Sequence, residues 1–190
     1  MTTTAETVPQ KHRLTVGEYY RMAETGILAP DARVELIEGE IIDKSPIGSM
    51  HAGQVSRLAE IFTLALVERA IVRVQSPLAL DDYNEPEPDI SLLRYREDFY
   101  TGGHPRPEDV WLVVEVADTT LKYDRGVKLP LYAAHGIPEF WLLDIPDKRL
   151  LVHRDPDPAN RSYRRVEVPD SLKSIALAAL PDVKLDLSGL

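Results

Sequence analysis

The feature that most constrains this chain is the run VWLVVEV, residues 110–116, which is apolar on both alternating faces except for Glu115. A strand of this kind is covered on both sides, so we expect it at the centre of a sheet. A carboxylate placed there is costly unless a cation or hydrogen-bond donors satisfy it. A metal ion would do so, and so would a structural partner such as Lys128 or an arginine; the residues alone leave both open.

The other segments supply elements to surround this strand. Residues 14–26 are expected to form a short helix with Thr15 as its cap and Gly26 as its end. Two short strands are predicted around Glu38–Gly39, and residues 51–69 carry apolar side chains with the period of an amphipathic helix. Strands interleaved with helices indicate an α/β (α+β) fold with a mixed central β-sheet flanked by helices. The remaining predictions are strands at 71–82, 85–94, 139–145, 149–155 and 162–168, and a helix at 124–135.

Length and composition narrow the class of protein. The 190 residues suit a single domain, predicted over 13–190 after a flexible N-terminal tail over 1–12. The absence of cysteine excludes disulfides and thiolate metal sites. A net charge of −9 argues against a broad non-specific grip on nucleic acid, but not against a local basic groove. No apolar run is long enough to cross a bilayer and no signal peptide is evident, so we expect a cytoplasmic protein without a membrane partner.

Two acids lie where a pair of strands could bring them together. Asp89 follows Pro88 at the start of a predicted strand, and Glu115 lies late in the next strong one. Adjacent strands are about 4.8 Å apart, so both carboxylates could hold one divalent ion, with the backbone carbonyl of Val116 as a further ligand. Mg²⁺ binds one or two carboxylates together with waters and phosphate oxygens, and Mn²⁺ is the alternative. The plainer interpretation of Asp89 is a turn acid at a strand entry.

A candidate cation follows on the predicted helix. Asp124, Lys128 and Tyr132 are spaced so that they share one helical face. Lys128 could stabilise the charge that builds on an attacked phosphate, although a lysine on a helix is more often simply solvated. Pro130 is awkward within a helix, so we expect the helix either to begin near residues 126–127 or to be kinked.

These pieces occur in a recognisable order. Six segments follow one another over roughly residues 14–155: VELIEGE, a helix opened by His51, PDISLL, VVEVADTT, DRGVKLPLY and GIPEFWLLD. In that order and spacing the chain resembles the Uma-type family of restriction-endonuclease-like proteins, within the PD-(D/E)XK nuclease superfamily. The resemblance implies a restriction-endonuclease-like fold and metal-dependent hydrolysis of DNA.

Carried over by position, the resemblance implies four catalytic residues. Asp89 is the acid of the PD pair and Glu115 the second acid, and both would bind the metal. Glu35 matches the upstream glutamate of the family. The lysine that ordinarily lies two residues after the second acid is absent, because that position is Ala117. Lys128, on the following helix, takes its place.

Two positions leave the function open. His51 matches a recurrent histidine to which the residues assign no role, and Asp118–Thr119 stands where the family usually has Ser-Pro. An extra acid there could change ion affinity or repel DNA. The first hypothesis is therefore a Mg²⁺- or Mn²⁺-dependent endodeoxyribonuclease, expected by analogy to act as a homodimer or larger oligomer. The alternative is a catalytically inactive nuclease-like binding or assembly module, and a hydrolase of small phosphoesters would use the same two acids.

Overall fold

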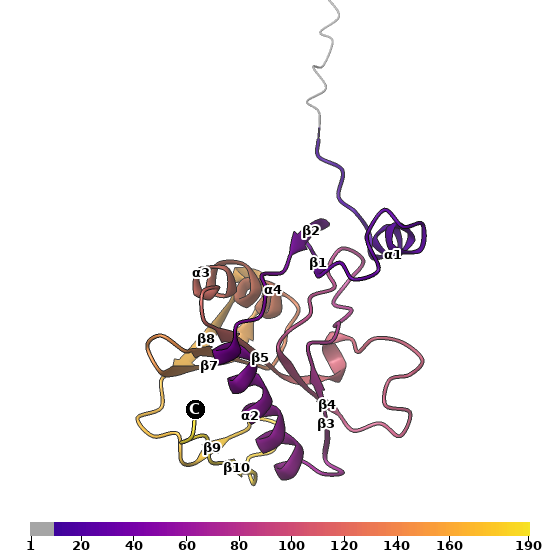
Figure 1. Cartoon of the computed structure of the whole chain (residues 1–190). Helices are drawn as coiled ribbons and strands as arrows, with labels where there is room; N and C mark the ends of the chain where they lie inside the picture. Colours follow the sequence, from indigo (N-terminus) through magenta and orange to yellow (C-terminus); the bar gives the residue numbers. More distant parts are fainter. Residues whose placement is uncertain (1–9) are drawn as a thin grey trace, which may run out of the picture.

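A six-stranded mixed sheet with the strand order β3-β4-β5-β6-β7-β8 forms the centre of the computed structural model (Figure 1). The model describes residues 10–190, so the predicted tail over 1–12 falls largely outside the described residues. Strands β5 and β6 are parallel, and every other neighbouring pair is antiparallel. The strands are β3 (Ala70–Val74), β4 (Ile90–Arg94), β5 (Val110–Ala117), β6 (Glu139–Asp144), β7 (Arg149–Asp157) and β8 (Ser162–Glu167).

Strand β5 is the buried central strand that its composition predicts. All of its residues are buried except Trp111, which is half-buried. Its register with β4 places Ile90 opposite Val114, so Asp89, just before β4, comes next to Glu115. Residues opposite one another on paired strands point to the same face. The strand register therefore brings the two predicted acids together.

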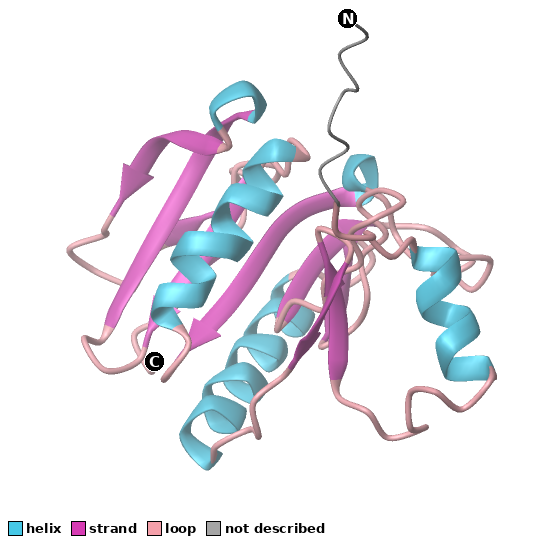
Figure 2. Ribbon diagram, turned by 90° about the horizontal axis from the view of Figure 1, so that it is seen from above, coloured by secondary structure: helices cyan, strands magenta, loops and turns pink. Residues whose placement is uncertain are grey.

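Helices cover both faces of the sheet (Figure 2). On one face lies α2 (Ser49–Ala65), whose Phe62 packs on Trp141 of β6 with the ring centroids 5.8 Å apart. The short strands β9 (Ile175–Ala176) and β10 (Lys184–Leu185) add apolar side chains to this layer. On the other face, α4 (Leu129–Ala134) buries Leu131 and Tyr132 against a second apolar cluster. Glu115 is thus enclosed on both sides, as the apolar sequence around it requires.

The N-terminal elements follow the predicted pattern. Helix α1 (Val16–Glu24) begins with a capping box, in which Thr15 and Glu18 satisfy each other's backbone N–H groups. Strands β1 (Val34–Ile37) and β2 (Glu40–Asp43) form an antiparallel hairpin separate from the main sheet. The turn at Glu38–Gly39 has positive φ angles of 52° and 77°. The predicted helix and both predicted strands are confirmed.

Two strand predictions are too long. The expected strands at 71–82 and 85–94 shrink to β3 and β4, and residues 75–89 form a connecting segment outside the main sheet. The segment contains Pro77, Pro86 and Pro88, which have no N–H to donate to a sheet ladder. As a result the segment is free to carry Glu87 and Asp89 to the end of the sheet.

The helix around Pro130 begins earlier than either predicted start. It opens as α3 (Leu121–Tyr123), widens into a π-helical turn η2 (Asp124–Lys128) and continues as α4. The prediction of a start near residues 126–127 was therefore wrong; instead of a later start, the helix has a π-helical turn directly before Leu129 and Pro130. Leu129 N–H bonds to Asp124 O, five residues back. The backbone hydrogen bonds have therefore shifted from the α-helical to the π-helical pattern directly before Pro130, which has no N–H to donate. The turn keeps Asp124 and Lys128 on the side of β5.

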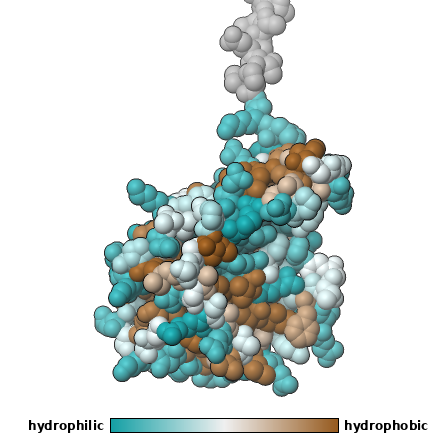
Figure 3. Space-filling view, viewed as in Figure 1, coloured by the Kyte–Doolittle hydropathy of each residue, from teal (hydrophilic) through white to brown (hydrophobic). Residues whose placement is uncertain are grey.

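Two short 3₁₀ turns, η1 (Pro107–Asp109) and η3 (Pro158–Asn160), complete the described elements. On the face seen in Figure 3, apolar side chains are scattered among hydrophilic ones. The exposed Met50, Leu64 and Val67 lie in or just after α2. No helix in the described part of the chain is long and apolar enough to cross a membrane.

The hairpin turn offers a test of the fold. A methyl group added at Gly39, which has φ of +77°, would lie 2.7 Å from Arg13 Cβ and 3.0 Å from Arg13 Cα. We predict that Gly39→Ala lowers the free energy of unfolding by about 1–3 kcal/mol in urea titrations. Gly53→Ala, within α2 and with no atom near the added methyl, should instead raise it by about 0.5–1 kcal/mol. Equal effects of the two changes would contradict this account of the turn.

Candidate active site

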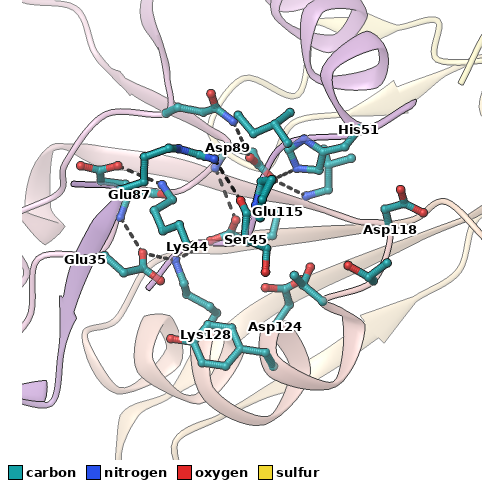
Figure 4. Close-up of a pocket in the computed structure, with 18 of the residues that line it drawn as sticks. Glu35, Lys44, Ser45, His51, Glu87, Asp89, Glu115, Asp118, Asp124 and Lys128 are labelled. Carbon is teal, nitrogen blue, oxygen red and sulfur yellow. Dashed lines mark hydrogen bonds and ion pairs between the residues drawn. The ribbon is translucent and has the colours of Figure 1, made fainter. Parts of the chain in front are cut away.

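A cleft of about 580 Å³ opens where the β1–β2 hairpin, the start of α2, the ends of β4 and β5, and the turn η2 meet (Figure 4). Its wall carries more acids than bases. The lysines and arginines are Arg33, Lys44, Lys122 and Lys128, and the carboxylates are Glu35, Asp43, Glu87, Asp89, Glu115, Asp118 and Asp124. This surplus of negative charge inside a cleft favours a cationic ligand.

Asp89 is held in place by three hydrogen bonds. Its Oδ2 accepts from Val116 N–H at 2.8 Å and from His51 Nε2 at 3.0 Å, and its Oδ1 accepts from Gln75 Nε2 at 3.2 Å. Burial alone raises the pKa of Asp89, but the hydrogen bond and charge of His51, with the other two bonds, bring it below its ordinary value. Asp89 is therefore an ionised and oriented carboxylate at neutral pH.

Glu115 lies beside Asp89 and is only 5% exposed. Its Oε1 accepts from the Tyr132 hydroxyl at 2.8 Å and lies 3.4 Å from Lys128 Nζ. Its Oε2 is 3.4 Å from Asp89 N. Burial raises the pKa of Glu115 to about 8; the charge of Lys128 opposes this rise, and the carboxylates of Asp89, Asp124 and Glu35 add to it. Glu115 thus retains a proton near neutral pH until a further cation approaches.

Lys128 links two strands from within the protein. Its Nζ donates to Glu35 Oε2 at 2.6 Å and lies 3.4 Å from Glu115 Oε1, with the side chain 4% exposed. Burial lowers the pKa of Lys128, but Glu115 and Glu35 outweigh burial and leave it raised. Glu35 Oε2 also accepts from Glu87 N–H at 3.0 Å. The structure therefore brings together all four residues predicted to be catalytic.

The remaining predicted residues have distinct places. Val116 lines the cleft and donates its N–H to Asp89; its carbonyl remains a predicted ligand. Asp124 accepts from the Thr120 hydroxyl at 2.6 Å, and burial raises its pKa to about 6. Asp118 makes none of the interactions drawn in Figure 4 and lies apart from the acid cluster. The extra acid of this chain is thus at the rim of the site and does not replace a central residue.

Sequence reasoning missed the roles of three residues. The role of His51 is to hold Asp89, and the only signal was its position at the start of a helix. Gln75 supports the same carboxylate from the end of β3. Lys44 enters the cleft from the end of β2 and bonds to Glu87 at 2.9 Å. No spacing along the chain relates Lys44 to Glu87, 43 residues away, so only the fold could reveal that pair.

The two central acids fit a hard divalent cation in an open site. Asp89 and Glu115 offer carboxylate oxygens, and Glu115 Oε2 has only a long contact to Asp89 N. Among residues 10–190, no three His, Asp or Glu side chains converge as in a closed metal cage. Mg²⁺ and Mn²⁺ accept such a set, since Mg²⁺ keeps several waters beside one or two carboxylates. Burial, together with the negative charge of Asp89, Asp124 and Glu35, raises the pKa of Glu115, and a bound cation would oppose that rise.

Comparisons with known proteins bear on the fold and on the family of this chain. A solved structure titled as that of a putative nuclease belonging to DUF820 from Anabaena variabilis superposes with a TM-score of 0.66. It covers 89% of this chain and 92% of its own, at 18% sequence identity. The chain therefore shares the mixed α+β fold of that structure. No curated protein matches the sequence.

The family follows from the sequence match. The model of the Uma2 family, described as "Putative restriction endonuclease", matches residues 16–188. The match covers most of the chain, so this protein belongs to the Uma2 family. The family and fold resemblance predicted from the ordered motifs is confirmed.

The buried ion pairs of Lys128 yield a prediction on stability. Replacing Lys128 by Met leaves Glu35 and Glu115 without their cation, which should lower the free energy of unfolding by about 3–5 kcal/mol at alkaline pH. The loss should shrink near pH 6, where Glu115, with a pKa of about 8, is protonated and needs no cation. Urea titrations at both pH values measure the difference. Lys122→Met, at an exposed lysine of the same helical segment, should change stability by at most about 0.5 kcal/mol.

Proposed function

We propose that this protein is a divalent-metal-dependent endonuclease that hydrolyses phosphodiester bonds of DNA, with Mg²⁺ or Mn²⁺ as its ion. The observation that carries the proposal is the proximity of Asp89, directly before β4, to Glu115 on β5, in an open cleft, with Lys128 Nζ at 3.4 Å from Glu115 Oε1. Two acids and a cation of this arrangement suit hydrolysis of a phosphodiester. Family membership supports the choice of DNA as substrate.

Each side chain has a definite task in this proposal. Asp89 and Glu115 hold the ion, which supplies Lewis acidity toward the phosphate and lowers the pKa of a bound water. His51 and Tyr132 keep the two carboxylates oriented through bonds of 3.0 and 2.8 Å. Lys128 favours the ionised form of Glu115 and places positive charge beneath the attacked phosphate.

Glu35 differs from the other acids in its partners. Its Oε2 is occupied by Lys128 Nζ and Glu87 N–H. We therefore assign Glu35 primarily to positioning Lys128, with binding of a second ion or a water as the role carried over from the family. A homodimer that addresses both DNA strands, and a cytoplasmic location, stay predictions.

The alternative is a nuclease-like binding or assembly module without catalysis. One observation favours it: the cation Lys128 already contacts two carboxylates and is almost fully buried. Such a network can be a structural ion cluster. Metal-dependent cleavage separates the two hypotheses directly.

Cleavage should depend on the first acid. We expect Asp89→Ala to reduce Mn²⁺-dependent nicking of supercoiled plasmid to the background seen without metal, because one of the two carboxylate ligands is lost. Asp43→Ala removes an exposed acid from the margin of the same cleft and should leave the rate within about twofold of the parent. Thermal unfolding of each variant checks the fold. An Asp89→Ala protein that cuts as fast as the parent would make the site assignment wrong.

Ion binding should be coupled to the proton on Glu115. Below pH 8 the carboxyl is largely protonated, and the ion must displace that proton to bind. We therefore expect Mn²⁺ affinity, measured by calorimetry, to rise as pH increases from about 6 and to level off above about 8. Glu115→Gln should abolish both the binding and its proton release. Affinity independent of pH in the parent would show that Glu115 is not a ligand.

A further inference from the structure

Lys44 is a second cation in the cleft, set on the opposite wall from Asp118 (Figure 4). It follows β2 directly, and its Nζ donates to Glu87 Oε2 at 2.9 Å and to Glu87 O at 3.2 Å. Its side chain is 18% exposed, whereas that of Lys128 is 4% exposed. Lys44 is therefore more accessible to an incoming ligand than Lys128 is.

The ammonium of Lys44 has capacity for another acceptor. A lysine carries three donors, and Glu87 takes two of them. None of residues 10–190 accepts the third. The Glu87 side chain is 29% exposed, and a partly solvated ion pair of this kind contributes little to stability. An anionic group of the ligand can thus replace Glu87 as the partner of Lys44 at a small cost in free energy.

The neighbouring residue makes this wall more basic. Arg33 lies opposite Lys44 at the end of the hairpin, where Lys44 N–H bonds to Arg33 O at 2.8 Å. The Arg33 side chain lines the same cleft and uses Nη1 to bond to Ser45 O at 3.0 Å. The cleft therefore has an acidic floor at Asp89 and Glu115, and the end of the hairpin adds two cations, Arg33 and Lys44, to its wall. A nucleic-acid strand offers phosphates both to an ion held at the floor and to these two cations.

We propose that Lys44 forms a phosphate subsite that binds the backbone phosphate next to the scissile one, and that Glu87 occupies Lys44 until the substrate arrives. The ligand class is a nucleic-acid strand with at least two consecutive phosphates. This inference rests on the proposed function and deepens it, because a small phosphoester has no second phosphate for the subsite.

Substitutions of Lys44 and of Glu87 are expected to change the affinity for DNA in opposite directions. Lys44→Gln removes the donor and should weaken binding of a fluorescein-labelled duplex, measured by anisotropy in Ca²⁺, by about 5–10-fold. The slope of log affinity against log salt should also fall by about one. Glu87→Gln removes the competing carboxylate and should tighten binding by about threefold or more. A Lys44→Gln change no larger than that of a lysine substitution outside the cleft would contradict the subsite.

Controls separate this subsite from general charge effects. Lys184→Gln on β10 makes the same charge change at an exposed residue outside the cleft and should leave affinity within about twofold of the parent. Unfolding curves confirm that Lys44→Gln and Glu87→Gln are folded. Hydrolysis of bis(4-nitrophenyl) phosphate in Mn²⁺ by the parent protein measures the proposed catalysis separately from the subsite, since that diester has one phosphate.

The outcomes distinguish the subsite from the nuclease activity. Opposite changes in affinity without cleavage by the parent would support the subsite and overturn the proposed catalysis. Cleavage by the parent, with both variants binding DNA as the parent does, would overturn the subsite alone. A parent that hydrolyses the small diester but binds no duplex would also overturn the subsite and indicate a small-molecule substrate.

Discussion

The ammonium of Lys128, enclosed between Glu35 and Glu115, is the interaction on which the rest of the site depends. It joins three elements that are distant in sequence: the turn η2, strand β1 and strand β5. Charges removed from water are tolerated only when they are paired and hydrogen-bonded. The same ammonium therefore stabilises Glu115 within the central strand and holds the β1–β2 hairpin against the sheet.

Among residues 10–190, one oxygen of the Glu115 carboxylate lacks a close partner, which leaves it open to a ligand. Glu115 has Lys128 and Tyr132 on one oxygen, and only a long contact to Asp89 N on the other. Burial and adjacent carboxylates still raise its pKa to about 8. A cluster built for stability alone would balance its charges, whereas this cleft retains an excess of carboxylates. We interpret the excess as the place for an ion.

The irregular parts of the fold serve this site. Prolines at 77, 86 and 88 keep residues 75–89 out of the ladder, and the segment delivers Glu87 and Asp89 to the cleft. The π-helical turn η2 places Asp124 and Lys128 toward β5 before Pro130. Such turns occur often at functional sites. Here the turn resolves a local conflict between helix and proline while orienting the buried lysine.

The sequence by itself determined the central strand, the capped first helix, the hairpin at Glu38–Gly39 and the pairing of Asp89 with Glu115. These depend on patterns that recur within a few residues, on the order of the motifs, and on the fixed spacing of adjacent strands. Only the tertiary structure decided that His51 holds Asp89, that Lys128 bonds most closely to Glu35, and that Lys44 lies against Glu87. Those contacts join residues 38, 93 and 43 positions apart, on elements whose relative placement follows from packing of the whole core. No local pattern encodes which polar side chains packing will bring together.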